Sequence, residues 1–104
     1  MDITPTELAA ELKGQSPPFL LDVREPHELE ISVLPGVVAI PLGELPARYS
    51  ALDKEADWVV ICRVGGRSGK ACEFLRAAGF ARVRNLVTGM NGYAQTVDTS
   101  LPVY

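Results

Sequence analysis

The residue with the clearest chemical potential in this sequence is Cys62, which directly follows the most apolar short stretch of the chain. Two glycines, Gly65 and Gly66, come next, and a helical pattern begins at about Arg67. Paired glycines let the backbone turn tightly, so that successive N–H groups can point at one spot. A helix N-terminus adds a partial positive charge and free N–H donors. The segment 62–68 therefore predicts a loop that stabilises an anion at its centre.

That anion can be the cysteine itself, because the reactive form of a cysteine is the thiolate. Helix N-termini and adjacent cations lower the pKa of a cysteine from about 8.5 into the range of roughly 3.5–7.5. The same loop would hold the negative terminal sulfur of a Cys-S-S⁻ persulfide. We therefore predict that Cys62 is a catalytic nucleophile, with a buried structural cysteine as the alternative. The residues predicted to bind its substrate are Arg63, Val64, Gly65, Gly66, Arg67 and Ser68.

The second cysteine, Cys72, is less suited to a catalytic role. It lies ten positions after Cys62, about three helical turns away, which is poor spacing for a resolving thiol. A small core residue is the expected role. Two cysteines and one histidine cannot supply the four N or S ligands of a common zinc site, so no metal is predicted. The histidine, His27, has no recognisable Asp or Ser partner and is predicted to lie on the surface.

Basic side chains are concentrated between positions 63 and 84 of a chain whose net charge is −3. They are Arg63, Arg67, Lys70, Arg76, Arg82 and Arg84. One interpretation is a solvated helix face with flanking loops, and the other is a positive field around an anion site. Because 13 acidic residues outnumber 10 basic ones, nucleic acid is not expected as a partner.

The length of 104 residues fits a single domain, 1–104, and a hydrophobic fraction of 47% is ordinary for a globular protein. No apolar run approaches the roughly 20 residues that span a bilayer, so no membrane partner is predicted. Segment 1–5 has no basic stretch followed by an apolar core, so we expect no secretory signal and a cytoplasmic location. A structural disulfide is not expected in that location.

The elements that must position Cys62 alternate between strands and helices. Short apolar runs predict buried strands at 19–23, 37–40, 57–61 and 82–86. Thr4, Pro5 and Glu7 form a capping pattern for a helix that stops at Gly14. Further helices are predicted over 42–52, 67–78 and 90–97. Such strands between helices indicate an α/β fold with a parallel sheet covered on both faces, which binds ligands beyond the carboxyl ends of its strands.

Four segments of the sequence carry the signatures of a known family. The segment 62–68, CRVGGRS, is similar to the active-site loop of rhodanese-type sulfurtransferases. LDVREPHE at 21–28 resembles the first signature of that family, LPGV at 34–37 with IPL at 40–42 resembles the second, and GMNGY at 89–93 resembles the C-terminal one. The segments cover nearly the whole chain in the expected order.

The resemblance implies a three-layer rhodanese-like domain in which helices flank a five-stranded parallel sheet. It also implies a sulfurtransferase that carries sulfane sulfur as a persulfide on Cys62, with no metal or organic cofactor. The donor would be thiosulfate or a protein persulfide, and the acceptor would be cyanide in vitro and a thiol or a sulfur-carrier protein in vivo. In the family, the counterparts of Asp22 and Arg24 fix the geometry of the loop, although a purely structural ion pair remains open for them.

The chain departs from the family pattern at a few positions. Thr88 stands where the family often has a glycine, and Tyr93 stands where it often has a tryptophan. The segment 31–36, ISVLPG, and the ending 97–104, VDTSLPVY, resemble rhodanese domains fused to adenylyltransferases of the molybdopterin, thiamin and thiolated tRNA pathways. None of the departures lies at the residue predicted to carry the sulfur.

Two other functions stay open. Cysteine phosphatases and arsenate reductases resembling this fold place five residues between the cysteine and an arginine, which gives a loop wide enough for a tetrahedral anion. Here four residues separate Cys62 from Arg67, and the shorter loop suits a single sulfur better. The second alternative is a non-catalytic binding module, which some family members become by losing the cysteine that this chain retains.

Overall fold

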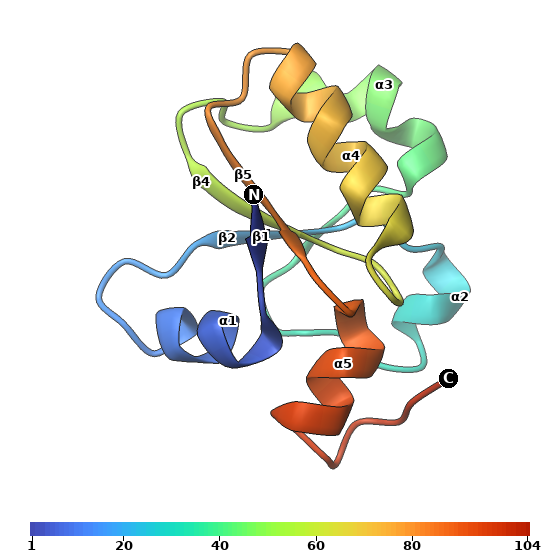
Figure 1. Cartoon of the computed structure of the whole chain (residues 1–104). Helices are drawn as coiled ribbons and strands as arrows, with labels where there is room; N and C mark the ends of the chain where they lie inside the picture. The colour runs from blue at the N-terminus through green and yellow to red at the C-terminus, as the bar shows by residue number, and fades with distance from the viewer.

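A parallel sheet of five strands forms the middle of the molecule, and helices cover both of its faces (Figure 1). The computed structural model describes all 104 residues. All neighbouring strands are parallel, which confirms the predicted α/β class and the three-layer arrangement. In the spatial order of the sheet, the strands are β1 (Asp2–Ile3), β5 (Arg82–Leu86), β4 (Asp57–Ile61), β2 (Phe19–Asp22) and β3 (Val38–Ala39).

Helices on the two faces enclose two separate hydrophobic clusters. Helices α3 and α4 pack on one face of the sheet, and α1 and α5 pack on the other. No helix combines the length and the apolar character that crossing a membrane requires. The helical elements are α1 (Pro5–Leu12), α2 (Pro26–Leu29), α3 (Leu45–Arg48), α4 (Gly66–Ala77) and α5 (Gly89–Thr96), with the 3₁₀ turns η1 (Leu42–Glu44) and η2 (Tyr49–Ala51).

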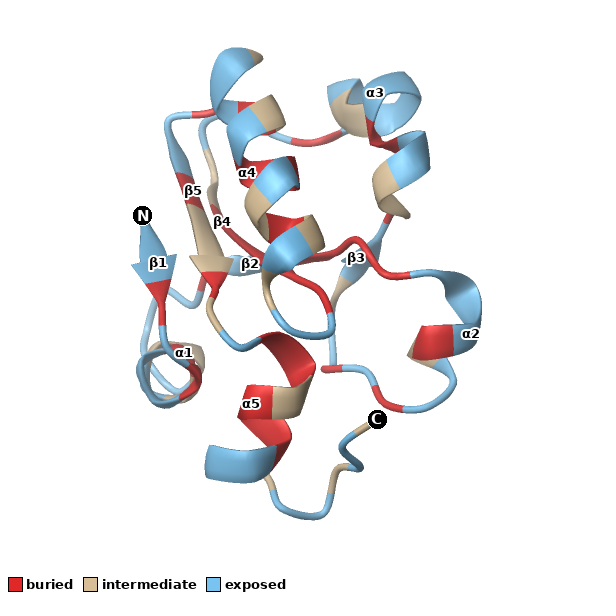
Figure 2. Cartoon of the chain, turned by 45° about the vertical axis from the view of Figure 1, so that its right-hand side comes forward, coloured by how far each residue is buried: buried red, intermediate tan, exposed pale blue.

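Strand β4 is apolar after its first residue, Asp57, because both of its sides are buried there. Successive side chains of a strand point to opposite faces, so Trp58 and Val60 join the cluster under α4, and Val59 and Ile61 join the one under α1 and α5. Cys62 continues the alternation on the α4 side. Figure 2 shows buried residues along the middle of the sheet and on the sides of α4 and α5 that face it. The strand therefore delivers Cys62 to a fixed place beneath α4.

The capping pattern predicted at the start of the first helix is confirmed. The Thr4 hydroxyl accepts a hydrogen bond from the Glu7 N–H at 3.1 Å, and the Glu7 carboxylate accepts one from the Thr4 N–H at 2.9 Å. The structure then differs just before this helix, because Asp2 and Ile3 form strand β1 beside β5. Two residues are too few to form a periodic pattern, so this strand could not be predicted from the sequence.

Two more segments differ from the prediction. The helix predicted over 42–52 is divided into η1, α3 and η2, because Pro46 has no N–H to continue an α-helical ladder through this segment. The segment Pro26–Leu29, for which no helix is predicted above, closes one turn of helix as α2. Both segments lie between β2 and β4, where short turns replace longer helices.

The turn between β5 and α5 uses two left-handed residues, Thr88 with a φ of 64° and Gly89 with a φ of 57°. The turn brings the N-terminus of α5 against the start of the Cys62 loop, where the Met90 N–H donates to the Cys62 carbonyl oxygen at 2.9 Å. A Cβ at position 89 would collide with the carbonyl oxygens of Cys62 and Arg63, so only glycine fits there. At position 88 the threonine hydroxyl donates to the carbonyl oxygen of the preceding residue, Val87, but a β-branched residue in this conformation is strained.

We expect Thr88→Gly to stabilise the fold. Removing the left-handed strain gains about 1–2 kcal/mol, and the extra freedom of glycine in the unfolded chain takes back about 0.4–1 kcal/mol. The free energy of unfolding from a urea titration should therefore rise by roughly 0.5–1 kcal/mol. Thr6→Gly, at an exposed right-handed position of α1, is the control and should lower it. Equal losses in both variants would contradict the strain at Thr88.

Candidate active site

Cys62 lies at the carboxyl end of β4, at the edge where parallel sheets bind their ligands. The residue is only 1% exposed, so its sulfur is withdrawn from bulk water. The chain then turns back through Gly65, whose φ of 108° favours glycine, and enters α4 at Gly66. The loop that was predicted over 62–68 is therefore present, and it folds around the sulfur.

Two donors from the loop are directed at the Cys62 sulfur. The Gly65 N–H lies 3.1 Å from Sγ, and the Ser68 hydroxyl oxygen lies 3.3 Å from it. Ser68 is fully buried in the first turn of α4, so its hydroxyl cannot turn away into solvent. The N-terminus of α4 adds its partial positive charge on the same side. This arrangement favours a negative charge on the sulfur.

The balance of these effects sets the pKa of Cys62. Burial raises the pKa of the thiol, but hydrogen bonds from the Ser68 hydroxyl and from the N–H groups of Ser68, Gly65 and Val64 together outweigh it. The pKa of Cys62 therefore lies below its ordinary value. A thiolate is the stronger nucleophile and the better leaving group, so the loop favours chemistry at this sulfur.

Asn85, in β5, is hydrogen-bonded to the loop, and the sequence analysis did not identify it as a site residue. Its side-chain N–H donates to the Gly65 carbonyl oxygen at 3.1 Å, and its oxygen lies 2.5 Å from the Ser68 hydroxyl. The hydroxyl has one proton and two acceptors within reach, Asn85 and the Cys62 sulfur. Asn85 therefore fixes both the αL turn of the loop and the position of the Ser68 oxygen.

Arg67 does not point into the loop, although the sequence placed it among the substrate-binding residues. Its guanidinium makes a bidentate pair with Glu28 of α2, at 2.6 and 2.8 Å. Hydrogen bonds from Arg67 lower the pKa of Glu28 to about 2, so the carboxylate stays ionised well below neutral pH. The pair ties the first turn of α4 to α2, and Arg67 acts on the loop from its rim.

Asp22 and Arg24 form a fully buried ion pair at 2.8 Å beside the end of β2. Every N–H of the Arg24 guanidinium has an acceptor, and the partners beyond Asp22 are the carbonyl oxygens of Glu28 and Ser32 and the hydroxyl of Tyr104. Burial opposes the charge of Arg24, but hydrogen bonds to Asp22 and Tyr104 hold its pKa above the ordinary value. Neither side chain forms a hydrogen bond to Cys62, and Arg24 is connected to the loop through Glu28, which pairs with Arg67.

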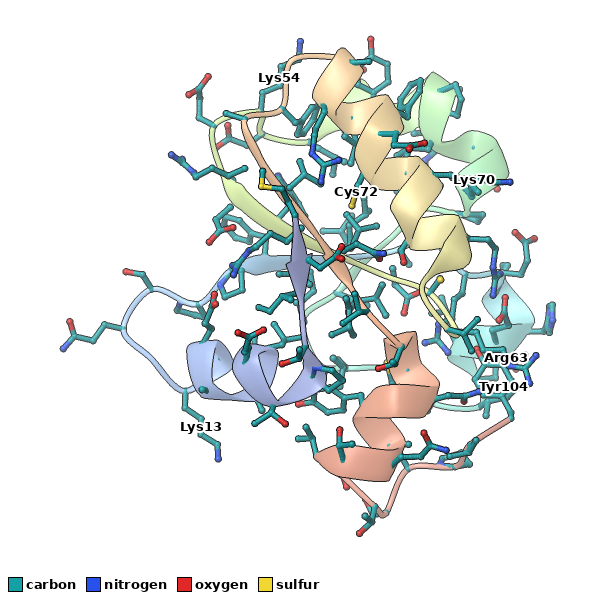
Figure 3. All side chains as sticks on the ribbon, viewed as in Figure 1. Lys13, Lys54, Arg63, Lys70, Cys72 and Tyr104 are labelled. Carbon is teal, nitrogen blue, oxygen red and sulfur yellow. The ribbon has the colours of Figure 1, made fainter.

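Arg63 and Val64, the first loop residues after Cys62, are exposed at the mouth of the site. The Arg63 guanidinium lies 5.1 Å from the centre of the Tyr104 ring, within the range of a cation–π contact. Figure 3 shows the two side chains together beside the end of the chain. Val64 is 59% exposed, so an apolar group also lines the mouth.

The remaining sequence expectations concern Cys72 and His27. Cys72 is buried in the cluster under α4, as expected for a core residue, and burial raises the pKa of its thiol to about 11. Figure 3 shows it beneath α4, away from Arg63. His27 is exposed in α2, as predicted.

Most of the clustered arginines make their specific contacts away from the Cys62 sulfur. Arg84 pairs with Glu11 and Asp57 at the far end of the sheet, and Arg67 pairs with Glu28. Arg76 and Arg82 donate to the backbone carbonyl oxygens of Val83 and Glu55. The loop therefore favours an anion mainly through uncharged N–H and hydroxyl donors.

Comparison with known proteins matches residues 4–96 to the family described as the rhodanese-like domain. The chain belongs to the rhodanese-like domain family. A protein of Allochromatium vinosum named "Sulfurtransferase" is 33% identical over 90% of this chain and 88% of its own length. Among solved structures, a rhodanese-like domain protein from Staphylococcus aureus superposes with a TM-score of 0.86 at 28% identity, covering 100% of this chain and 99% of that one.

Other relatives are longer proteins that contain this domain as one part. A chloroplastic Arabidopsis thaliana protein named "Rhodanese-like/PpiC domain-containing protein 12" is 40% identical over 99% of this chain, which spans 37% of its length. A maize "Adenylyltransferase and sulfurtransferase MOCS3-2" is 38% identical over 85% of this chain, which spans 20% of its length. The resemblance of the sequence to rhodanese domains of adenylyltransferases is thereby confirmed.

We expect the two thiols to differ in acidity. The rate of alkylation by iodoacetamide, followed site by site by peptide mass, should reach half its maximum at Cys62 below the ordinary midpoint of about pH 8.5. Cys72 should react only in strongly alkaline solution, because burial raises its pKa to about 11. In urea-unfolded protein both sites should return to the ordinary value. A shared midpoint in the folded protein would contradict the role of the loop donors.

Proposed function

We propose that this chain is a sulfurtransferase that carries sulfane sulfur as a persulfide on Cys62. The observation that carries the proposal is the pair of loop donors, the Gly65 N–H and the Ser68 hydroxyl, within 3.1 and 3.3 Å of the Cys62 sulfur. Membership in the rhodanese-like family and the relatives named sulfurtransferases support it. The proposed setting is the cytoplasm, where reducing conditions keep a thiolate available between turnovers.

In the first step, the Cys62 thiolate attacks the outer sulfur of thiosulfate. A new S–S bond forms to the enzyme, the S–S bond of thiosulfate breaks, and sulfite leaves with its electron pair. The product Cys62–S–S⁻ carries one negative charge, as the thiolate did, so no proton is needed. A protein persulfide can act as the donor in the same way, with a thiolate as the leaving group.

In the second step, an acceptor nucleophile attacks the outer sulfur, and the Cys62 thiolate leaves with the electron pair of the S–S bond. Cyanide serves in vitro and gives thiocyanate, and a thiol or a sulfur-carrier protein serves in vivo. The loop donors stabilise the thiolate as a leaving group, just as they stabilise it as a nucleophile. Arg63, Val64, Gly65, Gly66, Arg67 and Ser68 form the substrate-binding loop, and Asp22 and Arg24 hold its surroundings in place.

The geometry gives less support to the phosphatase alternative. A tetrahedral oxyanion is best held by a planar guanidinium fork, but Arg67 commits both of its terminal nitrogens to Glu28. Four residues between Cys62 and Arg67 also give a narrow loop. The binding-module alternative gains no support from a cysteine whose pKa is held down by dedicated donors.

Sulfur loading should depend on one cysteine only. After thiosulfate treatment, the intact mass of the wild-type chain should increase by one sulfur atom that a reductant removes. Cys62→Ala should show no adduct and no transfer to cyanide, with the fold retained. Cys72→Ala should keep most of the activity, because the buried Cys72 thiol is not in the loop. A folded Cys72→Ala variant as inactive as Cys62→Ala would show that the reaction needs a second thiol.

The wild-type chain should transfer sulfur and hydrolyse an aryl phosphate negligibly. Inserting one glycine between Gly66 and Arg67 should move the loop donors away from the sulfur, and losing one such donor typically costs about 10²–10³ in rate. The thiocyanate formation rate should therefore collapse in this variant, with circular dichroism as the check on folding. Phosphate hydrolysis faster than sulfur transfer in the wild type would overturn the assignment, and a Cys62 that thiosulfate does not modify would favour the binding module.

A further inference from the structure

Tyr104 contacts the surroundings of the loop although its partners lie far away in the sequence. Its hydroxyl accepts a hydrogen bond from Arg24 at 2.9 Å and donates one to Glu28 at 2.9 Å. Its backbone N–H donates to the Asn91 side chain of α5 at 3.0 Å. Figure 3 shows the Tyr104 side chain turned back toward Arg63 and the loop.

The position of the hydroxyl matters because Arg24 and Glu28 carry opposite charges. Arg24 is already paired with Asp22, and Glu28 is already paired with Arg67. The neutral hydroxyl of Tyr104 stands between these two pairs and satisfies one N–H of Arg24 and one oxygen of Glu28. Arg24 thereby stays paired with Asp22, and Arg67 stays paired with Glu28.

Loss of the hydroxyl would leave a buried guanidinium N–H without an acceptor, which is unfavourable. The nearest remedy is the Glu28 carboxylate, whose backbone carbonyl already accepts from the same Arg24 nitrogen. A Glu28 drawn toward Arg24 would hold Arg67 less firmly. Arg67 directly precedes Ser68 in the first turn of α4, and the Ser68 hydroxyl lies 3.3 Å from the Cys62 sulfur, so a freed guanidinium starts from the turn that already contacts the anion.

We propose that Tyr104 is a positioning residue that keeps the two ion pairs apart and so holds Arg67 on the rim, away from the Cys62 sulfur. The consequence for sulfur transfer rests on the proposed function, whereas the placement of Arg67 does not. With Arg67 held by Glu28, neutral donors bind the sulfur. With Arg67 on the sulfur, a full charge would lower the basicity of the thiolate and so weaken its attack on a sulfur donor.

The test is Tyr104→Phe, which keeps the ring beside Arg63 and removes only the hydroxyl. An opposite charge brought to a thiolate lowers its midpoint by about one pH unit or more, so the alkylation midpoint of Cys62 should fall by about one unit. Tyr49→Phe is the matched control, since Tyr49 packs against Phe74 on the other side of α4 and should leave the alkylation midpoint unchanged.

Two further variants make the assignment specific. Glu28→Gln should lower the midpoint as Tyr104→Phe does, and the two changes together should do no more than either alone. In an Arg67→Gln background, Tyr104→Phe should leave the midpoint unchanged, because the charge that moves is gone. An unchanged or raised midpoint in folded Tyr104→Phe would overturn the proposal, since mere loosening of the loop removes donors and raises it. Alkylation needs no sulfur donor, so these outcomes hold even if the wild type transfers no sulfur.

Discussion

A sulfur atom that must be charged to react has been placed where water scarcely reaches it. Burying an ionised group is costly unless the protein replaces the hydrogen bonds of water, and Cys62 is 1% exposed. The loop that begins at Cys62 supplies the replacement with the Gly65 N–H and the Ser68 hydroxyl. Those donors are held in place by Asn85, by the left-handed turn at Gly65 and by the contact of the loop with the start of α5.

The charged residues near the site do not bind the sulfur; they connect the segments that surround the loop. Asp22 with Arg24 joins the end of β2 to the segments that follow it, and Glu28 with Arg67 joins α2 to α4. A buried ion pair tolerates little displacement of either partner, because a lone buried charge is very unfavourable. The surroundings of the loop are therefore rigid, while the sulfur itself is surrounded by weak, neutral donors.

The sequence predicted the features that depend on local chemistry. The apolar run of β4, the cysteine after it and the glycine turn all appear where expected, because a strand buried on both sides and a tight turn each leave a clear pattern. Strand β1 and the role of Asn85 were missed, since a two-residue strand has no period and an asparagine in a strand gives no sign of its contacts. The sequence predicted Arg67 among the substrate-binding residues, but its partner Glu28, 39 positions away, could come only from the fold.

The Gly65 amide proton can also report the chemical state of the Cys62 sulfur, because the two are hydrogen-bonded. Its N–H lies 3.1 Å from the Cys62 sulfur in a site that solvent scarcely enters. The magnetic environment of that proton must therefore change whenever the sulfur gains a proton, loses one or takes on a second sulfur atom. A single amide resonance in an NMR spectrum would then distinguish the resting thiol, the thiolate and the loaded carrier, with no probe attached to the chain.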